Sequence, residues 1–191
     1  MRDPVTGWLA LTCIMALCRV AGGGELVVPV PVQVEMLSKL AGFDRSFRER
    51  AGSEARVLVV ETPASGDSHR AAQQIRSAFI QQPKLAGVPV SLSMLSYTGP
   101  AALAGACAEH KANVVYLAPG FDEQDVRAIA KALVGVTVLT ASAAASDVAA
   151  GAVVGFDLVE GKPKILVNLP QAQKQGVAFA ATLLSLARVL Q

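Results

Sequence analysis

Apolar and polar residues alternate along most of the chain in blocks that switch between strand length and helix length. Four short apolar runs are typical of buried strands, and the stretches between them place apolar residues at helical spacing. The runs cover residues 56–61, 88–95, 113–117 and 136–140. Strands that alternate with helices predict parallel βαβ units with right-handed crossovers.

The pattern changes after residue 150. Two further apolar runs, 152–159 and 165–168, flank Glu160-Gly161-Lys162, which is typical of a β-hairpin. A final helix is expected over 171–190, either continuous or broken at Gly176, and it is apolar on two faces. We therefore predict an α/β fold: a three-layer sandwich with a mixed sheet of five to six strands, ending in a β-hairpin and a helix.

The segment before the first central strand carries the predicted partner-binding residues. Residues 26–32 hold two prolines and favour an extended lead-in or an edge strand, and 33–48 have the spacing of an amphipathic helix. Aromatic and arginine side chains are common interface anchors, and four of them gather near the end of this helix. They are Phe43, Arg45, Phe47 and Arg48. Because Asp44 and Glu49 interleave with them, an ordinary polar helix end remains the alternative.

The N-terminus is typical of a secretory signal peptide. An apolar run at 8–18 is too short to span a bilayer and is followed by small residues at 21–24. We expect residues 1–22 to be removed, leaving 23–191 as a single domain in the periplasm. A buried first helix or an uncleaved anchor is the alternative. Cleavage leaves Cys107 as the single cysteine, which forms either a buried thiol or a bond to a second chain.

Composition narrows the function classes. Of the 191 residues, 52% are hydrophobic and only 5% are aromatic, and the net charge is +2. Such a chain has neither the basic field nor the stacking surface that nucleic acid requires, so no nucleic-acid partner is expected.

The residues offer no catalytic constellation. Ser68, next to Asp67 and His69, resembles an esterase nucleophile, but the last 80 residues hold no histidine that would activate it. A helix N-cap at Asp67 or Ser68 is the simpler interpretation. Cys107 and His110 lie three apart without a second ligand cluster. We expect no enzymatic activity, no cofactor and no metal. Asn168 is expected to cap the last helix.

The second half of the chain resembles the YfiR-like family of small periplasmic proteins. The resemblance covers residues 113–190 and is carried by the order of the strands and by a terminal block of matching residues. These are Asn168, Leu169, Ala172, Gly176, Leu183, Leu184, Leu186 and Ala187. The resemblance implies a regulatory homodimer that binds and restrains an inner-membrane signalling protein, such as a diguanylate cyclase.

Two other functions stay open. βαβ repeats also build periplasmic solute-binding modules, of which one lobe at most would fit this length. A secreted hydrolase that uses Ser68 is the third hypothesis.

Overall fold

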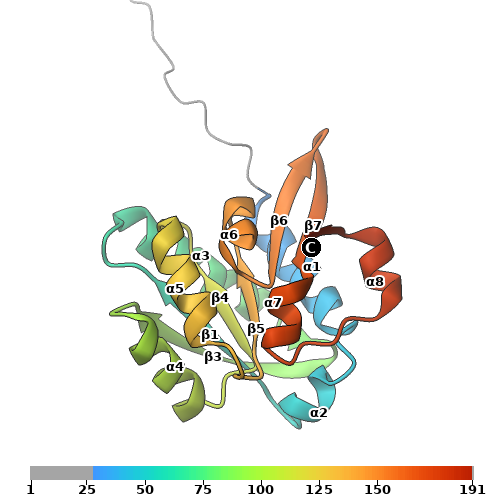
Figure 1. Cartoon of the computed structure of the whole chain (residues 1–191), viewed down its shortest axis with the longest axis horizontal. Coiled ribbons are helices and arrows are strands. Elements are labelled where there is room, and N and C mark those ends of the chain that lie inside the picture. The colour runs from blue at the N-terminus through green and yellow to red at the C-terminus, as the bar shows by residue number, and fades with distance from the viewer. Residues whose placement is uncertain (1–27, 191) are drawn as a thin grey trace, which may run out of the picture.

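The structure is a computed structural model that describes residues 28–190 (Figure 1). The predicted signal peptide therefore lies outside the described residues and stays a prediction. Within 28–190, every helix is too short or too polar to span a bilayer.

Eight strands form one mixed sheet in the order β2-β3-β1-β4-β5-β6-β7-β8. The strands are β1 (Ala55–Glu61), β2 (Lys84–Leu85), β3 (Val88–Ser96), β4 (Val114–Leu117), β5 (Leu139–Ser142), β6 (Val154–Val159), β7 (Lys162–Asn168) and β8 (Arg188–Leu190). The five strands from β3 to β6 in this order are parallel to their neighbours, whereas β2 pairs antiparallel with β3 and β7 pairs antiparallel with β6. The α/β class is as predicted, but the strand number is wrong.

The two additional strands are short and lie at the two edges of the sheet. β2 has two residues and β8 has three, so neither is long enough to show an alternating pattern in the sequence. The predicted hairpin is confirmed: β6 and β7 pair from Val154–Val167 to Val159–Lys162, and Glu160 and Gly161 at the turn both have positive φ. The hairpin projects beyond the body of the domain (Figure 1).

Helices cover both faces of the sheet. They are α1 (Val30–Ala41), α2 (Phe47–Ala51), α3 (Gly66–Gln81), α4 (Pro100–Glu109), α5 (Glu123–Ala132), α6 (Ala145–Ala150), α7 (Leu169–Lys174) and α8 (Ala181–Leu186). Residues of α1 and α3 pack in one core cluster with Val57 and Val59 of β1. Residues of α4 and α5 pack in a second cluster with Leu58 and Val60 of the same strand. The alternation of side chains along β1 thus supplies both cores.

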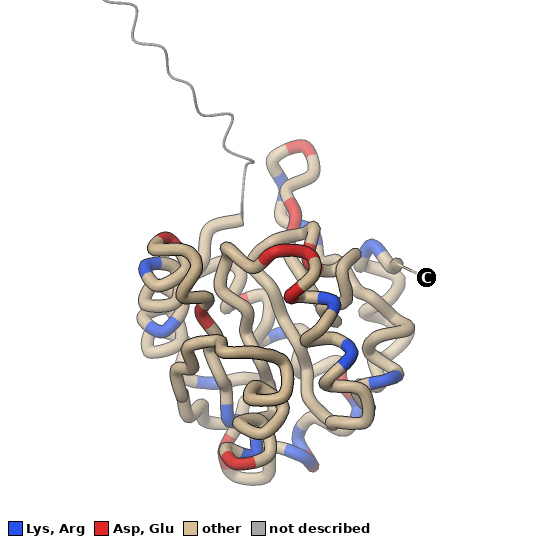
Figure 2. The backbone as a smooth tube through the Cα atoms, turned by 60° about the vertical axis from the view of Figure 1, so that its left-hand side comes forward, with Lys and Arg blue, Asp and Glu red and all other residues tan. Residues whose placement is uncertain are grey.

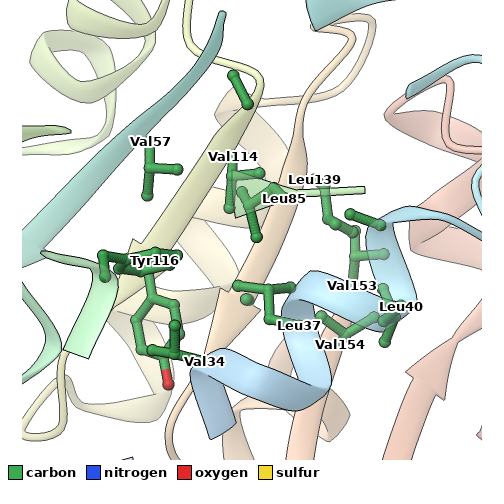
Figure 3. Close-up of a cluster of buried hydrophobic side chains, with 14 of the residues drawn as sticks. Val34, Leu37, Leu40, Val57, Leu85, Val114, Tyr116, Leu139, Val153 and Val154 are labelled. Atoms are coloured by element: carbon green, nitrogen blue, oxygen red, sulfur yellow. The ribbon is translucent and has the colours of Figure 1, made fainter. Parts of the chain in front are cut away.

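The first helix lies across the centre of the sheet. Val34, Leu37 and Leu40 project from α1 onto strand residues that include Val114 and Tyr116 (Figure 3). The buried Tyr116 hydroxyl donates to the side-chain carbonyl of Gln33, whose amide donates to Val28 O at 2.6 Å. Burial raises the pKa of Tyr116, so this hydroxyl remains a donor at any physiological pH. The buried polar side chains of Gln33 on the helix and Tyr116 on the sheet thus satisfy each other's hydrogen-bonding needs.

Two expectations for the N-terminal segment are wrong. Residues 30–32 are helical rather than extended, because prolines are tolerated in the first turn of a helix, where no N–H bond is lost. The predicted helix over 33–48 ends at Ala41, and a second helix begins only at Phe47. Between them the chain turns at Gly42 and forms an isolated bridge between Asp44 and Phe179.

The predicted C-terminal helix is broken at Gly176, which confirms one of the two alternatives, but its predicted extent to residue 190 is wrong. The segment folds as α7, a loop, α8 and the edge strand β8. Gly176 adopts φ +63°, a left-handed conformation that ends a helix. A Cβ added to Gly176 would lie 3.2 Å from the Thr137 side chain. Val177 and Phe179 of the loop are buried in the first core cluster, and Ala187 is extended. The two apolar faces therefore reflect a chain that packs on the core in several short pieces.

The start of α7 is as predicted. The side-chain oxygen of Asn168 accepts a hydrogen bond from the backbone N–H of Gln171 at 3.0 Å. Its amide group donates to Val148 O at 2.9 Å, which ties α7 to α6. Asn168 is thus an N-cap that also joins two helices.

Candidate functional site

The connection between α1 and α2 holds all four residues predicted to bind a partner. Phe47 is fully buried in the first core cluster, and Phe43 is half-buried against it. Arg45 and Arg48 are exposed. The structure brings the four residues together, but Phe47 belongs to the core and has no surface for a partner. We call residues 43–50 the arginine corner.

A buried ion pair fixes the arginine corner. The carboxylate of Asp44, whose side chain is 0% exposed, lies 2.7 Å from Nη2 of Arg50, which is 13% exposed. The other oxygen of Asp44 accepts from the backbone N–H groups of Ser46 and Ala178. The Arg50 guanidinium lies 5.8 Å from the centre of the Phe47 ring. A buried carboxylate with both a counter-charge and backbone donors holds one geometry, so the corner is rigid.

Two other segments anchor the exposed arginines. Nε of Arg48 donates to Ala86 O at 3.0 Å, in the turn between β2 and β3. The backbone N–H of Arg45 donates to Ala178 O at 3.0 Å. Among residues 28–190, neither arginine forms an ion pair. The fold therefore sets the position of the Arg48 guanidinium and of the Arg45 backbone, and neither side chain is compensated by an ion pair within the described residues.

The carboxyl ends of the parallel strands form a second candidate site. The chain leaves β1 and β4 toward opposite sides, and ligands of open α/β sheets bind at such a switch point. Here the loops after the two strands touch. Gly120 has φ +106°, and a Cβ added to it would lie 2.9 Å from Cβ of Ser65. The crevice between the loops is therefore closed at this point.

An aromatic pair lies beside this point. The rings of Tyr97 and Phe121 meet edge to face with centres 5.2 Å apart. The Tyr97 hydroxyl is buried and has no hydrogen-bond partner within the described part of the chain. Burial raises the pKa of Tyr97, and the carboxylate of Asp125 raises it further. An unpaired buried hydroxyl is costly, so it marks a position where either the nearby Asp125 carboxylate or a polar ligand atom would pair with it.

Ser68 does not have the geometry of a nucleophile. It is fully buried, and its Oγ accepts from the backbone N–H of Thr62 at 3.0 Å. His69 bonds through Nδ1 to Oε2 of Glu61 at 2.8 Å and is exposed. The capping prediction is also wrong, because α3 begins at Gly66 after Ser65, without a side-chain cap. Ser68 instead holds the turn after β1.

Cys107 and His110 do not form a site either. Cys107 is buried, and burial raises the pKa of its thiol to about 11, whereas His110 is exposed at the end of α4. A thiol with a raised pKa is a poor nucleophile. The residues from 28 to 190 hold no group of three or more His, Cys, Asp and Glu side chains that is suited to a metal ion.

Sequence reasoning missed one buried polar pair. The Ser142 hydroxyl donates to the carboxylate of Asp147 between β5 and α6. Burial raises the pKa of Asp147, and the bond from Ser142 opposes this only in part. No spacing in the sequence indicates the pair, because its partners come together only through the turn after β5.

Two grooves lie away from the carboxyl ends of the strands. One, of about 960 Å³, runs between α1 and α3 and is lined by Pro29, Glu35, Lys39 and Gln74 among others. The other, of about 420 Å³, lies between α5, α6 and α7 and carries Arg127, Lys131 and Lys174. Neither includes the arginine corner or Tyr97.

Fold and site together define an α/β domain with a mixed sheet, which presents a rigid cationic corner and, in its described part, no catalytic constellation. The chain belongs to the YfiR/HmsC-like family, whose model matches residues 31–188. This family is periplasmic and regulatory. A comparison with curated proteins found no significant match.

Solved structures share the fold. The chain is similar to an ABC domain from Streptococcus pneumonia in complex with L-Trp, with a TM-score of 0.60 and 12% identity over 85% of this chain. It is also similar to a conserved domain protein from Vibrio cholerae O1 biovar El Tor, with a TM-score of 0.59 and 16% identity over 88% of this chain. A third similar structure is the ligand-free, open form of a substrate-binding protein with adhesive properties from Clostridium difficile. Its TM-score is 0.57, with 11% identity over 83% of this chain. The chain spans 60–62% of the length of these proteins.

Proposed function

We propose that the protein is a non-enzymatic periplasmic regulator that binds and restrains an inner-membrane signalling protein, such as a diguanylate cyclase. The observation that carries the proposal is the family match over residues 31–188. The arginine corner supports it physically, because it offers exposed cations on a rigid frame. Preorganised groups bind with little loss of conformational entropy.

The proposed contact surface is the exposed part of the arginine corner. Arg45 and Arg48 lack counter-charges within the described residues, so an acidic surface of the partner would complement them. Such charges chiefly speed association and select the partner. Phe43, half-buried at the margin, adds an apolar contact.

Co-expression with a membrane-bound diguanylate cyclase from the same genome tests the proposal. Exported wild-type protein should lower cellular cyclic-di-GMP, and the Arg45→Glu and Arg48→Glu double variant should restore it. The matched control is Arg76→Glu with Arg188→Glu, which reverses two other exposed arginines and should repress like wild type. Equal cyclic-di-GMP with and without the exported protein, for every such cyclase, would contradict the proposal.

A solute-binding module is the second candidate. It is favoured by the fold shared with a substrate-binding protein and by the unpartnered Tyr97 hydroxyl near the strand ends. Calorimetric titration with a panel of amino acids that includes L-Trp tests it. Saturable binding that Tyr97→Phe weakens about tenfold supports this candidate, and absence of heat across the panel contradicts it.

A further inference from the structure

One long edge of the sheet is open. β3 has nine residues, and β1 pairs with it from Val90 to Ser96. On its other side β2 reaches only Val88 and Pro89. Beyond these, the outer edge of β3 has no strand beside it within residues 28–190.

The backbone groups on this edge follow from the strand's alternation. The N–H of Val90 donates outward to Pro83 O, and the N–H of Tyr97 donates inward to Glu61 O. The backbone N–H and C=O groups of successive strand residues point alternately to the two neighbouring strands. Leu92, Met94 and Ser96 therefore direct these groups outward, as Val90 does. Nothing in the described chain pairs with them.

The usual protections of an edge strand are missing here. Natural edges are blunted by charged side chains, prolines or bulges. From Ser91 to Ser96 the sequence is SLSMLS, and no residue between 88 and 108 carries a charge. Figure 2 brings the side of α4 forward and shows this stretch without blue or red. Before its last residue, Glu109, the exposed positions of α4, which shares the second core cluster with Leu95, are alanines and a glycine. Neither repulsion nor bulk opposes a neighbouring chain.

We propose that the open edge of β3 is a self-association interface, at which β3 pairs antiparallel with β3 of a second copy around a twofold axis at Met94. The family resemblance implies a homodimer but names no surface for it. A second copy fits because every group near a twofold axis meets its own counterpart, so a charge there would repel itself. An uncharged edge has no such penalty.

The register follows from the outward-facing residues. In an antiparallel pair, residues that point toward each other form the hydrogen-bonded pairs. Met94 then faces Met94 of the second copy, and Leu92 faces Ser96. Between these pairs Ser93 faces Leu95, so the two leucines of each strand lie beside serines of the other, and the two Met94 side chains lie beside each other at the axis. The eight-stranded sheet would continue across the axis as one sheet.

Register-specific crosslinking tests the proposal. Opposite residues of a hydrogen-bonded antiparallel pair have Cα atoms about 5.5 Å apart, within the disulfide range of roughly 4.4–6.8 Å. In the mature full-length protein, Met94→Cys should form a covalent dimer on mild oxidation. Leu92→Cys should not, because its proposed counterpart is Ser96, and Leu92→Cys mixed with Ser96→Cys should crosslink. Two results would overturn the register: a covalent dimer of Leu92→Cys alone in the same yield as that of Met94→Cys, or no covalent dimer of Met94→Cys.

Light scattering tests the interface without a cysteine. The wild-type protein should be a dimer at micromolar concentration, and Met94→Lys should raise the dimer dissociation constant at least a hundredfold. Met94 is 36% exposed, so the variant should keep its far-UV spectrum and unfolding midpoint. Ile80→Lys, on α3 at 57% exposure, is the matched control and should remain dimeric. A monomeric wild type at 100 µM, or an unchanged dimer in Met94→Lys, would overturn the proposal.

Discussion

The arginine corner depends on one buried residue pair. Arg50 supplies the counter-charge of the fully buried Asp44 carboxylate, and Lys39 forms a comparable bond of 2.7 Å to Glu35 on the surface. Removing one partner of a buried pair leaves an uncompensated charge, whereas exposed pairs contribute little.

Arg50→Ala should therefore lower the free energy of unfolding by about 3–5 kcal/mol. Lys39→Ala, at 71% side-chain exposure, should change it by less than about 0.5 kcal/mol. Urea denaturation of both variants measures the difference. Equal effects would show that the buried pair does not hold the corner.

Cys107 gives a second test at the residue scale. Burial raises the pKa of its thiol from 9.0 to about 11, so the thiol is protonated and covered at pH 8. A thiol reagent at pH 8 should label the folded protein at least a hundredfold more slowly than the protein in urea. Because the folded state holds this proton more tightly than the unfolded state, the contribution to stability is complete below pH 9 and is lost as the pH rises toward 11. Rapid labelling of the folded protein would contradict the buried position.

At the scale of elements, the sequence predicts the helices and strands that are long enough to show a repeating apolar pattern. The six longer strands and the central βαβ order follow from apolar spacing, and the β6–β7 turn follows from Glu160-Gly161-Lys162. In the C-terminal segment the sequence indicates a break at Gly176 as one alternative, but the apolar spacing of 171–190 suits a helix and does not indicate the extended Ala187 or the edge strand after it. The partner-site residues were predicted as a group, but the burial of Phe47 depends on a bend at Gly42 that periodicity does not indicate.

The contact between α6 and β6 tests packing at this scale. A Cβ added to Gly155 would lie 2.4 Å from Cγ2 of Val148 and 3.3 Å from Ala144 O. Since the valine is stiff and the carbonyl belongs to the backbone, Gly155→Ala should destabilise the fold by about 1–3 kcal/mol. Gly66→Ala meets nothing within 4 Å and should change stability by less than about 1 kcal/mol. Equal unfolding midpoints for the two variants would contradict the close approach.

At the scale of the whole molecule, the three proposed surfaces adjoin one another but are tested through different residues. The arginine corner follows α1, the Tyr97–Phe121 pair lies at the strand ends, and the open edge of β3 borders the sheet. Each proposed activity can therefore fail without the others, since separate variants address each of them.

Direct binding tests the central claim most closely. The mature protein should bind the purified periplasmic domain of the membrane cyclase in calorimetry, more weakly as the salt concentration rises, because exposed charges are screened. Arg45→Glu with Arg48→Glu should weaken binding at least tenfold, whereas Arg76→Glu with Arg188→Glu should bind like wild type. Unchanged affinity in the corner variant, with its fold intact, would contradict the assignment of the arginine corner as the regulatory surface.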